Sequence, residues 1–394
     1  MIRFLIITLI SITISASTLY LKEEWGTFSL TILYLTLIII MISISLFTKV
    51  KYKYNSVTLF LMLVFLIFGI IASLYNQDLD LFLRANIYFI LLISANIVIP
   101  SWLNEDTEKV ITKIILLTHI PILFIPILVN GFDEIPYYGI FSNPNSIAGV
   151  AVTIFAVFFA MIFNQFENIF FQKRNSKIYH MLFYIIALLF TVLIISYALS
   201  RTSFVTALIV FLSGMLLFLV NAFRLKKIGN VLRKGMFVFL PLILILYILN
   251  SYLDITKSIE NNIIGKFQRK SRNVLASRDE IWNQAINNSS FFGNGAHYFQ
   301  DKIGLGAHNT FVSLLGTYGW IPMLAILLFF IIAFYYVIKY FFKSESKYKY
   351  VAPLMLITFL TLSLAEDMNW KLSIIASLIL SGFYMNKQKI KITK

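Results

Sequence analysis

Residues 278–319 read RDEIWNQAINNSSFFGNGAHYFQDKIGLGAHNTFVSLLGTYG. They contain the end of a long polar segment, residues 253–309, in an otherwise apolar chain. From residue 253 to residue 309, no apolar run reaches the roughly 20 residues that a helix needs to cross a bilayer. Two of the four histidines, His297 and His308, lie in this segment. We therefore expect a bundle of membrane helices that holds this loop, residues 253–309, over a polar site at one membrane face.

The composition places the chain in the class of all-α polytopic membrane proteins. Of its 394 residues, 59% are hydrophobic and only 13% are charged, whereas a soluble domain carries about 25% charged residues. We expect a single integral membrane domain, residues 1–394, with no separate soluble domain. The absence of cysteine excludes disulfides, thiolate catalysis and cysteine-based metal sites.

Hydrophobic windows predict about twelve transmembrane helices, with the long loop between the ninth and tenth spans. The predicted spans are residues 2–21, 27–48, 56–75, 82–100, 110–129, 146–163, 181–199, 204–222, 236–252, 310–338, 351–365 and 371–385. The first of them has no clear small-residue cleavage site, so we interpret it as a retained span rather than a signal peptide.

The distribution of basic residues predicts the orientation of the spans. With residue 1 in the cytoplasm, 22 of the 33 lysines and arginines fall on the cytoplasmic side, and only four lie in the short outer loops, which are acidic instead. This is the pattern of the positive-inside rule. We expect a plasma-membrane protein with both termini in the cytoplasm and the 253–309 loop outside. The rule also accounts for the net charge of +15, so nucleic acid is not an expected partner.

Arginines at the outer ends of spans are candidates for anion binding. Arg201 lies in SRTS, residues 200–203, between two spans that leave almost no loop. A guanidinium at this depth needs a partner, and its planar fork of donors suits a diphosphate or a carboxylate. Arg84, near the outer end of the fourth span, is a second candidate. For both, the alternative is an arginine that snorkels to lipid headgroups.

The long loop contributes a second arginine together with an aromatic residue. Arg278 and Trp282 are four positions apart, so they share one face of a helix. Arg278 could bind an anion, while Trp282 stacks on a sugar or lies at the membrane interface. The alternative for Arg278 is an ion pair with Asp279 or with a nearby carboxylate.

At the end of the loop, His308 and Asn309 precede a span. Histidine is the usual general acid or base near neutral pH, so His308 is the candidate catalytic group. The alternative is helix capping at the interface, with Asn309 or Thr310 as the cap. His297 is the competing histidine of the loop.

A third polar element, FSNPNSIAG at residues 141–149, opens the sixth span. Asn-Pro favours a turn and a helix start, which is our interpretation of Pro144. Asn145 remains a candidate for binding sugar hydroxyls. The sequence contains no His-x-x-x-His pair, Walker loop or dinucleotide fingerprint, so no metal site or nucleotide cofactor is expected.

The order of these motifs resembles the O-antigen ligase and O-antigen polymerase superfamily over about the last two-thirds of the chain. The matching stretches are SRTS (200–203), RDEIW (278–282), FFGNG (291–295), AHNTF (307–311), LLGTYGW (314–320) and FSNPNSIAG (141–149). Gly316 departs from the pattern, because an acidic residue is more usual between the family's His-Asn pair and the following glycine. This departure weakens any role for a carboxylate at that position.

The resemblance implies a GT-C-like helical bundle that acts as a metal-independent glycosyltransferase, without a cofactor, on undecaprenyl diphosphate-linked oligosaccharide. Arg201 and Arg278 would neutralise the diphosphate, and His308 would activate or position the acceptor. The residues expected to bind substrate are Arg84, Asn145, Ser203, Trp282 and Asn309.

Two activities fit the family. A polymerase passes the growing chain to the next lipid-linked repeat unit, which builds an O-antigen, capsule or exopolysaccharide. A ligase passes the finished chain to lipid A core or another acceptor. We favour the polymerase, because a ligase to lipid A core needs an outer membrane that the sequence cannot show. A repeat-unit flippase and a chain-length regulator are the implied protein partners.

The competing class is a transporter for a small anion such as bicarbonate. A transporter should place charged residues midway through its spans or break its helices there. A flippase for lipid-linked sugars should likewise line a central cavity with charge. This chain keeps its ionisable residues at the outer rim of the predicted bundle, which favours the transferase.

Overall fold

The computed structural model describes residues 2–19, 26–132, 135–172, 178–231, 233, 247, 251, 254–265, 278–367 and 374–387. These residues form helices and connecting turns, and no strand occurs among them. Most of the ninth predicted span, 236–252, lies outside the described residues, as does the stretch 266–277 of the long loop.

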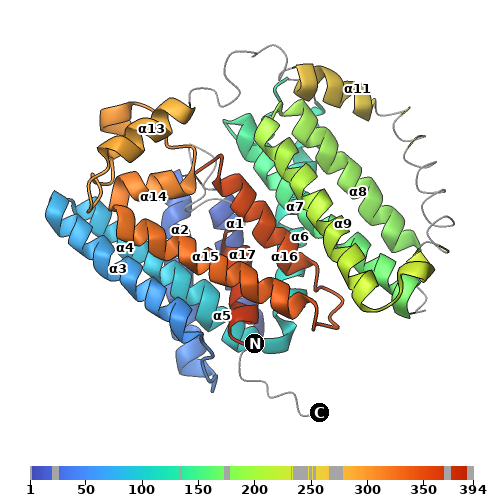
Figure 1. Cartoon of the computed structure of the whole chain (residues 1–394), viewed down its shortest axis with the longest axis horizontal. Coiled ribbons are helices and arrows are strands. Elements are labelled where there is room, and N and C mark those ends of the chain that lie inside the picture. Colours follow the sequence, from blue (N-terminus) through green and yellow to red (C-terminus); the bar gives the residue numbers. More distant parts are fainter. Residues whose placement is uncertain are drawn as a thin grey trace. The chain divides into compact units, whose positions relative to one another are not determined.

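The chain divides into two compact units, each made of helices (Figure 1). Unit 1 comprises Met1–Thr118, Asn273–Tyr340 and Phe359–Lys394, and unit 2 comprises His119–Arg272 and Phe341–Thr358. Three of the four boundaries fall inside helices: α6 (Thr107–Asn130), α15 (Trp320–Phe341) and α16 (Val351–Ser363). The expectation of one membrane domain stays a prediction.

In unit 1, helices that follow one another in the sequence pack in pairs. The helix at the end of the chain packs against them. Its elements besides parts of α6, α15 and α16 are α1 (Ile2–Leu19), α2 (Gly26–Phe47), α3 (Ser56–Asn76), α4 (Leu79–Ile93), the π-turn η2 (Ser94–Val98), α5 (Ile99–Leu103), η3 (Asn104–Asp106), α13 (Arg278–Asn288), η6 (Phe299–Ile303), α14 (Thr310–Tyr318) and α17 (Ile374–Met385). α1 packs on α2, and α3 packs on α4. α17 packs on η2, where Gly382 leaves no room for a Cβ beside the Asn96 carbonyl.

Unit 2 is organised around an almost wholly buried helix. Its elements besides parts of α6, α15 and α16 are α7 (Pro144–Glu167), η4 (Asn168–Gln172), α8 (Ile178–Tyr197), α9 (Arg201–Arg224), α11 (Ile255–Ile259) and η5 (Glu260–Ile264). α7 packs against α8 and α9. At one end of α7, buried Glu167 lies 2.7 Å from Lys349 Nζ and accepts hydrogen bonds from Asn221 and Tyr350. The partners satisfy a charge that would otherwise be costly to bury.

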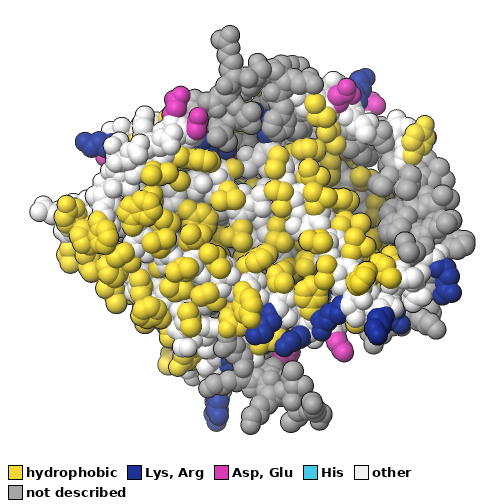
Figure 2. Space-filling view, in the orientation of Figure 1, with side chains coloured by type: hydrophobic (Ala, Val, Ile, Leu, Met, Phe, Trp, Pro, Cys, Tyr) yellow, Lys and Arg dark blue, Asp and Glu magenta, His cyan; other side chains and the backbone are white. Residues whose placement is uncertain are grey.

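Eight helical segments of the described chain are long and apolar enough to cross a membrane. They are Ile2–Leu19, Phe28–Phe47, Ser56–Asn76, Leu79–Val129, Pro144–Phe171, Tyr179–Tyr197, Arg201–Arg224 and Trp320–Phe341. Figure 2 shows hydrophobic side chains on the surface of α3 and α15, which expose Phe60, Ile67, Leu328 and Ile331 among others. Apolar side chains on the outside of a helix fit lipid as the solvent. The architecture is that of a helical multi-pass membrane protein.

The tenth predicted span, residues 310–338, is not one continuous helix. It consists of α14, which ends at Tyr318, and α15, which begins at Trp320. Between them Gly319 has φ +91°, and a Cβ there would lie 2.1 Å from the Phe291 carbonyl oxygen. Only glycine adopts this conformation readily and permits this close approach. Hydropathy alone did not reveal the break, because the residues on both sides are apolar.

Candidate functional site

The eight candidate residues fall into the two units. Unit 1 contains Arg84, Arg278, Trp282, His308 and Asn309, and unit 2 contains Asn145, Arg201 and Ser203. The site in unit 1 lies where α13, the start of α14 and the end of α16 come together.

α13 is attached to the core of unit 1 through one face. Ile281 and Ala285 are buried in a cluster with Tyr298, Phe299 and Ala307. Trp282 packs against this cluster, and its indole Nε1 donates a hydrogen bond to the Ala307 carbonyl at 2.9 Å. The indole therefore fixes the backbone directly before His308. The sequence predicted that Trp282 stacks on a sugar or lies at the membrane interface. It did not predict the hydrogen bond to Ala307.

Glu366 joins the two candidate residues of the long loop. Its Oε1 lies 3.0 Å from Arg278 Nη2, and its Oε2 lies 3.3 Å from His308 Nδ1. The side chain of His308 is 42% exposed, whereas those of Arg278 and Glu366 are 18% and 22% exposed. One carboxylate thus contacts both a cation and a potential base. The ion pair of Arg278 with a nearby carboxylate is the alternative that the sequence left open.

The backbone around Glu366 is fixed to the start of α14. Thr310 Oγ1 donates a hydrogen bond to the Glu366 carbonyl at 3.2 Å, and Asn309 Nδ2 donates to the Leu364 carbonyl at 3.1 Å. Glu366 was noted in the sequence only as part of an acidic outer loop. Because 58 positions separate it from His308, local spacing carried no signal for their contact.

The geometry gives His308 one oriented and one available ring nitrogen. Its Nδ1 faces the Glu366 carboxylate. When Nδ1 carries the proton and donates it to that oxygen, Nε2 is left as an acceptor. The residue has φ +48°, a conformation that is uncommon for side chains with a Cβ. A half-exposed imidazole held in this way is suited to accept a proton from a bound hydroxyl.

Asn309 is the cap of α14. Its Oδ1 accepts hydrogen bonds from the N–H groups of Phe311 and Val312 at 2.9 and 3.1 Å, and the residue is 8% exposed. The predicted helix cap is therefore confirmed as Asn309, whereas the catalytic role of His308 stays a prediction. Both ends of the side-chain amide have partners within the protein, so the structure gives no support to the predicted contact of Asn309 with substrate.

Two of the sequence motifs, FFGNG and LLGTYGW, pack backbone against backbone. Asn294 N–H donates to the Gly316 carbonyl at 2.8 Å. A Cβ at Gly293 would lie 2.3 Å from the Thr317 carbonyl oxygen, and one at Gly316 would lie 2.6 Å from the Phe299 ring. The absence of an acidic residue at position 316 thus has a steric reason: its side chain would displace Phe299.

A second polar cluster links the loop to the start of α4. Asp80 Oδ2 lies 2.7 Å from Arg84 Nη2 and 3.2 Å from His297 Nε2. Arg84 Nη1 also donates to the Ala296 carbonyl at 3.4 Å. The predicted diphosphate-binding Arg84 is therefore engaged within unit 1, where it helps to hold the loop.

Asp78 also holds the loop at this cluster. Its Oδ1 accepts the N–H of Leu81 at the start of α4, and its Oδ2 accepts the N–H of Ala296 at 2.7 Å. Burial alone raises the pKa of Asp78, but these backbone hydrogen bonds and the positive charge of His297 outweigh it, so the pKa lies below 3.8. The ionised form therefore stabilises the fold above that pH, and this contribution is lost as the pH falls through the lowered value.

Replacement of Asp78 by alanine should loosen the loop and lower stability by about 1–2 kcal/mol, because a helix cap and a long-range hydrogen bond are lost. Asp78→Asn should have a smaller effect, since an amide oxygen can still cap α4. Thermal unfolding of the detergent-purified protein at pH 7 measures both changes. Equal stability of Asp78→Ala and the wild type would contradict this role of the carboxylate.

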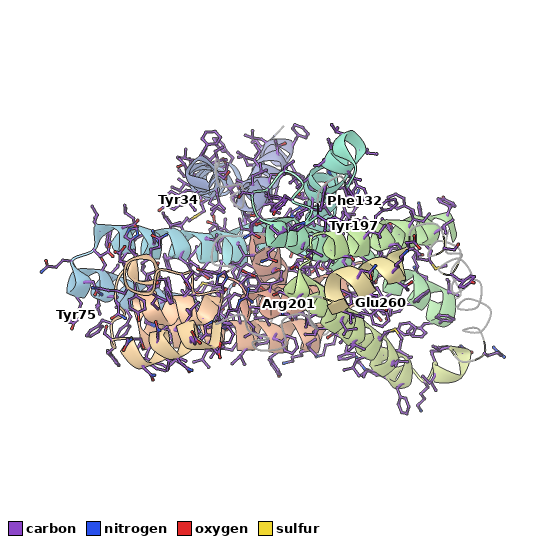
Figure 3. All side chains as sticks on the ribbon, turned by 90° about the horizontal axis from the view of Figure 1, so that it is seen from above. Tyr34, Tyr75, Phe132, Tyr197, Arg201 and Glu260 are labelled. Atoms are coloured by element: carbon purple, nitrogen blue, oxygen red, sulfur yellow. The ribbon has the colours of Figure 1, made fainter. Side chains whose placement is uncertain are left out.

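The candidates of unit 2 lie at the starts of two helices. Arg201 is the first residue of α9, and the buried Ser200 caps that helix by accepting the N–H of Ser203 at 3.4 Å. Close to this start, Tyr197 stacks on Phe132 with ring centroids 4.5 Å apart (Figure 3). Asn145 is the second residue of α7, and its N–H donates to the capping Asn143 at 2.8 Å. The predicted turn and helix start at Pro144 are confirmed.

No protein-family model matches the chain, and no curated protein matches it. Among the described residues, no three His, Asp or Glu side chains form a group that could hold a metal ion.

Proposed function

We propose that the protein is a metal-independent membrane glycosyltransferase of the polysaccharide polymerase type. It extends an oligosaccharide carried on undecaprenyl diphosphate at the outer face of the plasma membrane. The supporting observation is the Glu366 carboxylate that contacts both Arg278 and His308. A fixed guanidinium beside a half-exposed imidazole supplies the charge and the base that transfer from a diphosphate requires.

In the proposed reaction, His308 Nε2 takes the proton of the acceptor hydroxyl. The hydroxyl oxygen forms a bond to the anomeric carbon of the donor sugar, and the bond between that carbon and the phosphate oxygen breaks. Undecaprenyl diphosphate leaves with the bonding electron pair. Arg278 balances the negative charge that develops on the leaving group. The imidazolium then returns its proton to water.

The direct test uses the purified protein in lipid nanodiscs. The probe is the lipid-linked repeat unit extracted from cells that lack the protein. We expect longer lipid-linked chains and released undecaprenyl diphosphate, in equal amounts with and without EDTA. Transfer only to a different acceptor would identify a ligase instead. No transfer, together with anion uptake by proteoliposomes, would replace the enzyme with a transporter.

Reporter fusions test the orientation that the proposal requires. Fusions after Asn55 and Lys347 should report the cytoplasm, because the basic loops stay inside. Fusions after Asp78 and Lys270 should report the outer side. A cytoplasmic signal after Lys270 would contradict the proposal, since the lipid-linked glycan and the loop would then lie on opposite sides of the membrane.

Replacement of Glu366 by glutamine should slow transfer without abolishing it. Hydrogen bonds to charged groups contribute about 1.5–3 kcal/mol, so we expect a loss of roughly 10- to 100-fold. Initial rates in the nanodisc assay measure this loss. An unchanged rate would leave Glu366 with a purely structural role.

A further inference from the structure

A polar pocket lies beside the cluster that supports His308. Its volume is about 450 Å³, within the roughly 300–1,000 Å³ that is typical of small-molecule sites. Its lining comes from the end of α3, from α13, from the FFGNG turn and from η6. We call it the amide pocket, and its lining residues are Asn76, Gln284, Asn288, Asn294, Tyr298, Lys302 and Ile303.

Two of the four amide side chains are held in place by the protein. Asn76 Nδ2 donates to the Ala72 and Phe292 carbonyls at 2.8 and 3.3 Å. Asn294 Nδ2 donates to the Asn288 carbonyl at 3.1 Å, and its Oδ1 accepts the N–H of Ser290 at 3.4 Å. These contacts join α3, the loop and the end of α13, so the pocket has a fixed frame.

The other polar groups of the lining are available to a ligand. Within the described part of the chain, no hydrogen bond or ion pair engages the side chains of Gln284, Asn288, Tyr298 or Lys302. Gln284 and Asn288 are exposed and four positions apart, so they share one face of α13. This face differs from the one that carries Arg278 and Trp282.

The chemistry of these groups matches the hydroxyls of a sugar. Each amide offers two donor hydrogens and an acceptor oxygen, and a sugar hydroxyl likewise donates and accepts. Tyr298 adds an aromatic side chain and a phenolic hydroxyl, and Lys302 adds three donor hydrogens. A diphosphate would call for several cations, and the lining contains only one. An apolar lipid tail would leave the amides without partners.

The pocket is connected to the reaction site through shared packing. Tyr298 belongs to the buried cluster of Ile281, Ala285, Phe299 and Ala307. Ala307 directly precedes His308, and Trp282 donates a hydrogen bond to its carbonyl. A sugar bound against Tyr298 would therefore lie on the same rigid framework as the candidate base.

We propose that the amide pocket binds one or more sugar residues of the glycan substrate and helps to select it. This inference rests on the proposed function, because it makes the pocket a saccharide subsite of the same transferase. It adds Gln284, Asn288 and Tyr298, which the motifs do not include, to the residues proposed to contact the substrate.

The test compares two double variants on the same helix. Gln284→Ala/Asn288→Ala removes the available amides, whereas Asn283→Ala/Asn287→Ala removes exposed amides that do not line the pocket. With the extracted lipid-linked repeat unit as the probe, we expect the first variant to raise KM about tenfold with little change in kcat. The control variant should match the wild type. Equal KM values in the two variants would overturn the proposal.

A binding experiment separates this inference from the proposed function. The probe is the free oligosaccharide released by mild acid from the same lipid-linked fraction, and the protein is the His308→Ala variant in nanodiscs. Binding should persist in this variant and weaken about tenfold when Gln284→Ala/Asn288→Ala is added. Lys302→Ala on η6 serves as a second variant if the double variant does not fold. Binding that survives both changes would overturn the pocket proposal, whereas absence of transfer by the wild type would overturn only the proposed function.

Discussion

Cells that carry His308→Ala in place of the wild-type protein should lose long-chain polysaccharide and accumulate the single lipid-linked repeat unit. Removal of a general base typically costs about 10²–10⁴-fold in rate. Alanine also leaves Glu366 without one of its two partners, but the ion pair of Glu366 with Arg278 remains. The main loss should therefore be the proton acceptor. Chain length on gels and lipid-linked intermediates by mass spectrometry measure the result.

His297→Ala is the matched control for this experiment. His297 lies in the same loop and also contacts a carboxylate, with its Nε2 3.2 Å from Asp80 Oδ2. However, the other partner of Asp80 is Arg84, which is not part of the proposed reaction site. The control should make near-normal chains. Equal defects in the two variants, or normal chains in His308→Ala, would remove His308 from the catalytic role.

Loss of either Arg201 or Arg278 should abolish long-chain polysaccharide while the protein level stays normal. The motifs assign each guanidinium to the charge of the diphosphate, so alanine at either position should remove that stabilisation. Lysine at either position should restore only part of the activity, since it keeps the charge but lacks the bidentate fork. Immunoblots of the membrane fraction and polysaccharide gels provide the measurements.

Arg278 needs an additional control, because it is paired with Glu366. If Arg278 only neutralises that carboxylate, the Arg278→Ala/Glu366→Ala double variant should be as active as Glu366→Ala alone. If Arg278 binds the diphosphate, the double variant should be far less active than Glu366→Ala. If both the Arg201→Ala and the Arg278→Ala variants make normal polymer, the alternatives hold: Arg201 snorkels to lipid headgroups, and Arg278 forms only an ion pair.

The sequence predicted the positions of most helices, because long apolar runs and capping residues are local signals. The predicted span 56–75 corresponds to α3, Ser56–Asn76, and the span 351–365 corresponds to α16, Val351–Ser363. The capping role of Asn309 and the helix start at Pro144 were also recognisable from a few adjacent residues. The predicted total of about twelve spans and their orientation stay predictions.

The contacts that build the candidate site are not local, and they could not be read from spacing. Glu366 reaches His308 across 58 positions, and Asp78 reaches Ala296 across 218. The sequence identified Arg278 and His308 as separate candidates, but it did not predict that one carboxylate joins them. Nor did it predict the amide pocket, whose lining combines the end of α3 with three parts of the loop.

The close approach of Gly293 and Gly319 has a mechanical consequence. Where two backbones touch without side chains between them, no rotamer change can absorb a small displacement. A shift of α15 at its junction with α14 would therefore be transmitted directly to the FFGNG turn. Asn294 belongs to this turn, and Tyr298 follows it, so both pocket residues would be displaced. α14 would transmit the same shift to the backbone at His308. We therefore expect the pocket and the base to respond together to a tilt of α15.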